Sequence, residues 1–466
     1  GALQPNRTSV EAAASTEVRF GWRAPEGGGW LYDAVLEVEC RGLPAQIERA
    51  AILVWDGRPR PGWPGVRFEG GLCKLDGEDS WLLGANPYTN DPRGIGAFFD
   101  TMRPPRRPLP SVWERDLSIL RLTGGNAVRQ HYLEHLIRPE SFEEPGGDRG
   151  LRILDAYNLL AAEMGMANLL DPFTFDLRRY LPRWWGRRHE GDPLTEEAWL
   201  RDEERYLEGL ARRARPFPNV CFEIANEPEG YGMEAKTAEE RERFARNVEA
   251  WTSRMRAALE RGGAKVVAMG LAHAANSPIW SPKTTLKGLD YYHVHIYSPT
   301  LNAWNARFFA PFGLNFGRPC LVGEFGMPNA ANSGGEVELR GWEGPYDRIF
   351  AFVTAERGLG LTNFYLVISD FHPDSPEWGV LFPDLTEKPA FLTWKKWAAI
   401  WQVLRREDLL PPNFALVYSP KTRLSDPSTF DLVARAYLAL LKMGVRALVC
   451  SPGELAGGRW RAILLA

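Results

Sequence analysis

The stretch NVCFEIANEP, residues 219–228, begins as a buried β-strand and ends on three residues that a strand does not favour. The largely apolar run 220–225 is typical of a strand covered on both faces, as in a parallel sheet. Pro228 cannot donate a ladder hydrogen bond, and it biases the residue before it away from helix. The sequence therefore predicts a buried strand that ends by presenting Asn226 and Glu227 in a loop.

Short apolar segments alternate with long amphipathic segments between about residues 72 and 408. Strand followed by helix at this rhythm indicates a parallel sheet, and eight such units fit a (β/α)8 barrel. An open doubly wound sheet is the alternative, but the glycine-containing segment 94–99 lacks the third glycine of a phosphate-binding loop. The expected strands are 81–86, 126–129, 166–170, 220–225, 266–269, 292–295, 320–323 and 364–368, and the expected helices include 236–262 and 344–357.

Three further segments flank the expected barrel, which we place at residues 72–408. Residues 1–15 are expected to be a disordered leader, and residues 16–71 a β-rich accessory module, because β-like runs alternate there with Gly/Pro turns. Residues 409–466 are expected to form a partial α/β domain. Because this segment stops on an apolar strand, we expect that the chain was cut there or that a longer domain follows in the native protein. The predicted fold class is α/β, a (β/α)8 barrel with a small N-terminal β-sandwich-like module and a C-terminal Rossmann-like segment. The expected flanking strands are 17–22, 33–40, 51–55, 414–418, 446–450 and 462–465, with a helix at 426–443.

The composition is that of a soluble globular protein, with 44% hydrophobic residues, 25% charged residues and a net charge of −3. This weak charge favours no nucleic-acid partner, and no apolar run reaches the ~18 residues of a membrane span. The N-terminus has no apolar signal core, so the bacterial cytoplasm and secretion with the signal removed both stay open. The cysteines show no metal-binding spacing, so no metal or cofactor is predicted, although a Cys40–Cys73 disulfide stays open.

A second glutamate ends another predicted strand in the same way. The segment PCLVGEFG, residues 319–326, places Glu324 after an apolar run, three strands beyond the strand that carries Glu227. Active-site residues of parallel barrels lie at the C-terminal ends of the strands, so the two glutamates are expected to face each other at the barrel mouth. One such glutamate is usually a solvated loop residue, but a pair favours catalysis. Paired carboxylates cleave glycosidic bonds, one as proton donor and the other as ionised nucleophile.

These segments resemble the clan A glycoside hydrolases, and glycoside hydrolase family 5 in particular, over roughly residues 75–400. The resemblance rests on NEP at the end of the fourth strand and GEFG at the end of the seventh, with weaker marks elsewhere along the chain. The weaker marks are KLDG (74–77) before GAN (84–86), GNAVR (125–129), HVHIY (293–297) and GVL (379–381) through KPAF (388–391). The resemblance implies hydrolysis by double displacement with retention, with Glu227 as general acid/base, Glu324 as nucleophile and carboxyl groups roughly 5–5.5 Å apart.

The chemistry of the side chains around the two glutamates fits the same assignment. Arg129 can pair with the Glu324 carboxylate, and Tyr297 can donate a hydrogen bond to the same carboxylate. Asn226 can hold the sugar 2-hydroxyl. His295 can bond near Glu227 or the leaving group, or it is an ordinary core histidine. The further candidates for substrate binding are His131, Asn86, Tyr88, Trp280, Asp370 and Trp378.

The chain departs from the family pattern in places. Family 5 members commonly carry a histidine after the third strand, where this chain reads LDPF (170–173). His131 can fill this gap, and NAVRQHY (126–132) is similar to the catalytic domains of family 2 β-glycosidases. The C-terminal segment is similar to the Rossmann-like domain of clan A β-galactosidases such as those of family 42, which suggests a homo-oligomer.

Several functions stay open within this resemblance. A β-1,4-mannan or glucan is the favoured substrate, and an exo-acting β-mannosidase, β-glucosidase or β-galactosidase is the alternative. A non-catalytic carbohydrate-binding barrel would have lost one of the two glutamates. A metal-dependent hydrolase would show more ligands than the pair His293 and His295. Carbohydrate is therefore the expected partner, and polysaccharide degradation the expected process.

Overall fold

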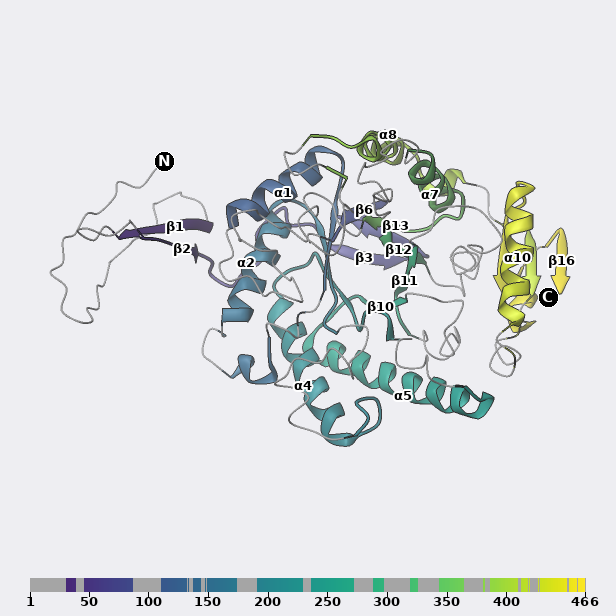
Figure 1. Cartoon of the computed structure of the whole chain (residues 1–466), viewed down its shortest axis with the longest axis horizontal. Helices are drawn as coiled ribbons and strands as arrows, with labels where there is room; N and C mark the ends of the chain where they lie inside the picture. The colour runs from purple at the N-terminus through teal and green to yellow at the C-terminus, as the bar shows by residue number, and fades with distance from the viewer. Residues whose placement is uncertain are drawn as a thin grey trace, which may run out of the picture.

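The computed structural model describes residues 31–38, 46–86, 110–131, 133, 137–143, 147, 149–173, 191–228, 236–271, 288–296, 319–325, 343–363, 380–381, 386–409, 412–417, 419, 426, 428–450, 452–458 and 460–465. At the centre lies a closed barrel of eight strands with helices around it (Figure 1). All neighbouring barrel strands are parallel, each lies beside the next one along the chain, and the last pairs with the first. The predicted (β/α)8 barrel is confirmed.

The barrel strands are β6 (Leu82–Ala85), β7 (Ala127–Gln130), β8 (Ala167–Leu170), β9 (Val220–Glu223), β10 (Val267–Leu271), β11 (Tyr291–Ile296), β12 (Cys320–Phe325) and β13 (Gly360–Asn363). The helices between and after them are α1 (Pro110–Leu122), α2 (Arg149–Glu163), α4 (Glu197–Ala214), α5 (Ala238–Gly262), α7 (Glu343–Ala355) and α8 (Pro389–Val403), with short 3-10 helices η2 (Pro139–Phe142) and η4 (Arg406–Asp408). The first seven predicted strands match to within two residues at their ends. The eighth lies at GLTN, before the more apolar run 364–368 where we expected it, and that run is outside the described residues.

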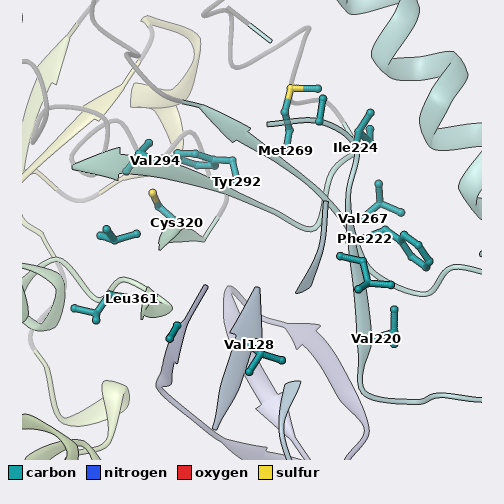
Figure 2. Packing of buried hydrophobic residues seen from close by; sticks show 14 of the residues in the cluster. Val128, Val220, Phe222, Ile224, Val267, Met269, Tyr292, Val294, Cys320 and Leu361 are labelled. Atoms are coloured by element: carbon teal, nitrogen blue, oxygen red, sulfur yellow. The ribbon is translucent and has the colours of Figure 1, made fainter. Parts of the chain in front are cut away.

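Alternate side chains along each strand belong to two different apolar clusters. Val220 and Phe222 on β9, with Tyr292 on β11, belong to the larger cluster, which the helices share (Figure 2). Cys221, between Val220 and Phe222, and Tyr291, next to Tyr292, belong to a second cluster. Because successive side chains of a strand point to opposite faces, the second cluster fills the barrel interior. The parity of a residue in its strand therefore decides whether it can reach the interior.

A small antiparallel sheet closes one end of this interior. It consists of β3 (Val66–Glu69), β4 (Leu72–Leu75) and β5 (Glu78–Asp79). The Phe68 ring stacks on Tyr291 at the start of β11, with ring centroids 4.7 Å apart. The Val66 amide donates a 3.1 Å hydrogen bond to Pro218 O, just before β9. These contacts are at the N-terminal ends of barrel strands, so the C-terminal ends form the other opening.

The remaining N-terminal strands, β1 (Leu31–Val38) and β2 (Gln46–Leu53), pair antiparallel and project from the barrel (Figure 1). The leader 1–15 and the strand expected at 17–22 lie outside the described residues. The predicted boundary between the accessory module (16–71) and the barrel (72–408) falls in the turn between β3 and β4. Cys73 on β4 is buried and free, so the Cys40–Cys73 disulfide is not formed, and burial raises the pKa of its thiol to about 12.

The C-terminal segment forms a three-stranded parallel sheet in the order β15-β14-β16, built from the three strands expected there. Its elements are β14 (Phe414–Val417), α10 (Thr429–Lys442), β15 (Ala447–Cys450), the 3-10 helix η5 (Pro452–Gly457) and β16 (Ala462–Leu465). Val433 and Tyr437 of α10 lie in the same apolar cluster as the barrel helices. None of the helices within the described residues is both long and apolar enough to cross a membrane.

Candidate active site

Polar side chains from six barrel strands converge at the C-terminal opening. Such positions are where parallel barrels carry their functional groups, because the loops that follow the strands meet there. The converging residues are Asn86 after β6, Arg129 and His131 of β7 and its end, Asp171 after β8, Glu223, Asn226 and Glu227 of β9 and its end, His293 and His295 on β11, and Glu324 on β12.

The backbone of Glu227 adopts a left-handed conformation with φ of 52°. This region is uncommon for a residue with a side chain and persists where neighbouring contacts enforce it. The Glu227 amide donates a 3.0 Å hydrogen bond to Gly270 O of β10, and the Asn226 amide donates a 2.9 Å bond to Phe173 O. Backbone hydrogen bonds thus hold the turn after β9 to strand β10 on one side and to the segment that follows β8 on the other.

A β-bulge places Glu324 on the interior side of β12. Val294 of β11 pairs with Val322, whereas His295 pairs with Glu324, so Gly323 is an extra residue in β12. The extra residue reverses the facing of the rest of the strand, so Glu324 comes to the same side as His295. Residue 323 must be glycine in this packing, because a Cβ there would overlap the His293 ring.

Both glutamates lie close to the same nitrogen of His295. His295 Nδ1 lies 2.5 Å from Glu227 Oε1 and 3.4 Å from Glu324 Oε2. One nitrogen of His295 and one oxygen of each glutamate all lie within 4.8 Å of one another. The Glu227 side chain is 22% exposed, compared with 5% for Glu324. Glu227 is therefore the carboxyl group that a bound molecule or water can reach from the opening.

The guanidinium of Arg129 is buried beneath this pair and bonds through each of its nitrogens. Nη1 donates to Glu324 Oε1 at 2.7 Å, and Nη2 donates to Asn226 Oδ1 and to Asp171 Oδ2, both at 2.9 Å. Nε donates to Glu223 Oε2 at 2.5 Å. Burial opposes the positive charge, but the three surrounding carboxylates outweigh it and hold the pKa of Arg129 above its usual range.

Three buried histidines complete the cluster. Burial, with the charge of Arg129 acting in the same direction, holds the pKa of His131, His293 and His295 below the usual value, so they are neutral imidazoles at pH 7. His131 Nε2 lies 2.5 Å from Asn86 Oδ1 and 3.3 Å from Glu324 Oε1. Since these rings are neutral, Arg129 supplies the positive charge that faces the carboxylates among the residues that the structure describes.

The structure thus brings most of the predicted site residues together. Asn226, Arg129, His131, His295 and Asn86 all contact one another or the two glutamates. The other candidates, Tyr297, Tyr88, Trp280, Asp370 and Trp378, lie outside the described residues and stay predictions.

Site roles for Glu223 and Asp171 were not predicted from the sequence, and His293 was considered only as a metal ligand. A signal was present for the two acids. Glu223 interrupts the apolar run 220–225 at the last residue of β9, and Asp171 follows β8 directly. A carboxylate at either place needs a buried cationic or hydrogen-bonding partner, and Arg129 is that partner for both.

The arrangement offers two kinds of chemistry. A carboxyl group reachable from the opening and an anionic carboxylate fixed by a guanidinium can act as proton donor and nucleophile. The same nitrogen and two oxygens of His295, Glu227 and Glu324 are also donors that a metal ion such as Zn²⁺ can bind.

No protein-family model matches the sequence, and no curated protein matches it. Solved structures do match its fold. The crystal structure of GH5_18 from Streptomyces cattleya in complex with GlcNAc has a TM-score of 0.66 and 19% sequence identity, covering 83% of this chain and 98% of that one. A variant of GH5_18 from the same organism, in complex with Manb1-4GlcNAc, has a TM-score of 0.66, 18% identity and coverages of 83% and 99%. Exo-beta-1,4-mannosidase Op5Man5 from Opitutaceae bacterium strain TAV5 has a TM-score of 0.56, 16% identity and coverages of 84% and 72%. Likeness at these identities establishes a shared fold.

Proposed function

We propose that this protein is a clan A glycoside hydrolase that cleaves β-glycosides with retention of configuration. The observation that carries this proposal is the meeting of Glu227 and Glu324 at the C-terminal opening of the barrel, with oxygens within 4.8 Å of each other. Retaining enzymes hold their carboxyl groups about 5–5.5 Å apart, whereas inverting enzymes leave roughly 6.5–9.5 Å for a water molecule.

In the proposed reaction, a Glu324 oxygen attacks the anomeric carbon while Glu227 gives its proton to the departing glycosidic oxygen. The resulting glycosyl ester is hydrolysed by a water molecule that Glu227, now a carboxylate, deprotonates. The 2.5 Å contact of Glu227 with His295 is compatible with both the protonated and the ionised form of Glu227. Neutral imidazole Nδ1 accepts a hydrogen bond from a protonated carboxyl group, and the other tautomer donates one to the carboxylate.

For the substrate, we propose a terminal β-mannoside on a short acceptor, the exo-acting alternative, rather than internal bonds of mannan or glucan. The support is the shared fold with GH5_18 structures and with an exo-β-1,4-mannosidase. Asn226 Oδ1 accepts a hydrogen bond from Arg129, which orients the amide so that its Nδ2 can donate to a sugar hydroxyl. Three expectations stay predictions: that the catalytic domain spans residues 72–408, that 16–71 and 409–466 are accessory segments, and that the protein is a homo-oligomer.

A panel of aryl β-mannoside, β-glucoside and β-galactoside, with Manβ1-4GlcNAc and mannan polymer, tests this proposal. We expect kcat/KM for the β-mannoside to exceed that for the other aryl glycosides by at least about tenfold. Mannose should be released from the disaccharide, and proton NMR of the first product should show the β-anomer. Inversion at the anomeric carbon, or faster cleavage inside the polymer, would contradict the proposed mechanism or the proposed substrate respectively.

A metal-dependent hydrolase is the second candidate, because Glu227, His295 and Glu324 form a donor set for a divalent cation. If the carboxylates act directly, dialysis against EDTA or 1,10-phenanthroline should leave kcat/KM unchanged to within about twofold. Added Zn²⁺ should inhibit, since it would occupy the atoms that react. Loss of activity on dialysis, with recovery on adding Zn²⁺ or Mn²⁺, would instead favour the metal-dependent reaction.

A further inference from the structure

We propose that Glu223 is a positioning residue that holds the Arg129 guanidinium in the orientation the two catalytic carboxylates require. This inference rests on the proposed function and adds to it a residue that lies beneath the opening. Glu223 is fully buried, so it does not touch a bound substrate and can act only through its neighbours.

Glu223 connects three strands of the barrel. It is the last residue of β9, and its Oε2 accepts the 2.5 Å hydrogen bond from Arg129 Nε of β7. Its Oε1 accepts a 3.1 Å hydrogen bond from the Tyr291 hydroxyl of β11. His293 Nε2, also on β11, lies 3.0 Å from Oε2. Two side chains of β11 thus contact the Glu223 carboxylate in addition to the Arg129 guanidinium.

The position of Arg129 Nε decides where its other nitrogens point. A guanidinium is planar and rigid, so one bond at Nε sets the directions of Nη1 and Nη2. With Nε on Glu223, Nη1 faces Glu324 at 2.7 Å and Nη2 faces Asn226 at 2.9 Å. These two acceptors belong to different parts of the barrel, since Glu324 is on β12 and Asn226 follows β9. A single buried contact therefore aligns the nucleophile and the residue beside the acid/base.

The charge of Glu223 also matters. Burial would raise the pKa of Glu223, but Arg129 and His293 outweigh it and hold the pKa well below its usual range. Glu223 is therefore an anion at neutral pH that offsets part of the guanidinium charge. Without it, Arg129 would be drawn toward its remaining partners, Glu324 and Asp171, and the attacking oxygen would lose its alignment.

Glu223→Gln is the variant that tests this role. Glutamine keeps the shape, but its amide nitrogen would face a donor where the carboxylate now accepts from Arg129 or Tyr291. We expect kcat per titrated active site to fall about 10²-fold while KM stays within about threefold, because alignment and not binding is lost. Active-site titration by the burst of aryl product removes the contribution of any misfolded fraction.

Glu203→Gln is the matched control. Glu203 on α4 is also fully buried and accepts a 2.8 Å hydrogen bond from Trp251 Nε1. Burial raises the pKa of Glu203 well above its usual value and so favours the neutral carboxyl group, which glutamine matches in shape. The Glu203 variant is expected to keep the wild-type kcat, KM and active-site titre.

A double-mutant cycle with Arg129→Lys separates positioning from a general effect on the fold. Lysine keeps the positive charge but lacks the planar fork, so Glu223→Gln should cost less than about threefold in kcat in that background. If Glu223→Gln does not fold, Tyr291→Phe, which removes one donor to Glu223, is expected to lower kcat about fivefold at unchanged KM.

Three results would overturn the inference. They are a wild-type kcat in fully titrated Glu223→Gln, an undiminished loss in the Arg129→Lys background and, where the glutamine variant does not fold, a wild-type kcat in Tyr291→Phe. Each of them leaves the proposed function intact, provided that the wild-type protein hydrolyses β-glycosides. A wild-type protein without such activity would instead refute the proposed function and this inference together.

Discussion

Glu324→Ala is expected to lower kcat at least about 10⁴-fold, equivalent to about 5.5 kcal/mol of transition-state stabilisation. Glu324 is the carboxylate that Arg129 holds at 2.7 Å, and the bulge at Gly323 turns it toward His295. Alanine removes the oxygen that would bond to the anomeric carbon, and no covalent intermediate can then form. The measurement is kcat and KM on an aryl β-mannoside, with thermal unfolding to show that the variant is folded.

Covalent labelling provides an independent test of the same residue. A 2-deoxy-2-fluoro mannoside with a good leaving group should inactivate the wild-type protein and add its mass to the peptide that contains Glu324. Glu203→Gln should label at the wild-type rate, since Glu203 lies on α4 and bonds to Trp251. Label on a different residue, or more than about 1% of wild-type kcat in Glu324→Ala, would remove Glu324 from its role.

Glu227→Ala is expected to show a loss that depends on the leaving group. A poor leaving group needs a proton to depart, so kcat/KM for an alkyl or disaccharide substrate should fall about 10²–10⁴-fold. A dinitrophenyl glycoside departs without a proton, so its kcat/KM should fall less than about tenfold. The intermediate should then accumulate, because the variant has no base to activate water at the place where Glu227 reaches the opening.

Azide extends this test of Glu227. A small anion needs no general base and fits the space that the missing side chain leaves, so azide should restore turnover of the dinitrophenyl substrate. The product should be the β-glycosyl azide, because the anion attacks from the side that Glu227 occupied. Equal losses for good and poor leaving groups, without azide rescue, would assign the proton transfer to another group. His295, which contacts Glu227 at 2.5 Å, would be the first candidate.

Local patterns in the chain were enough to predict the barrel and the two strand-end glutamates. Apolar runs separated by amphipathic segments predict parallel strands with helices between them, and Pro228 after β9 marks the point where that strand ends. Once the strands are parallel, the C-terminal ends of β9 and β12 must meet at one opening, which places Glu227 and Glu324 there.

How these side chains face each other depends on the folded barrel. The bulge at Gly323 arises from the register of β12 against β11, and no local pattern in PCLVGEFG shows it. Glu223 and Asp171 take their meaning from Arg129, which lies 94 and 42 residues away from them in sequence. Such contacts depend on strand register and on the loss of water around the charges. Both properties arise when the barrel closes, so the sequence shows that the residues are present but does not show which of them pair.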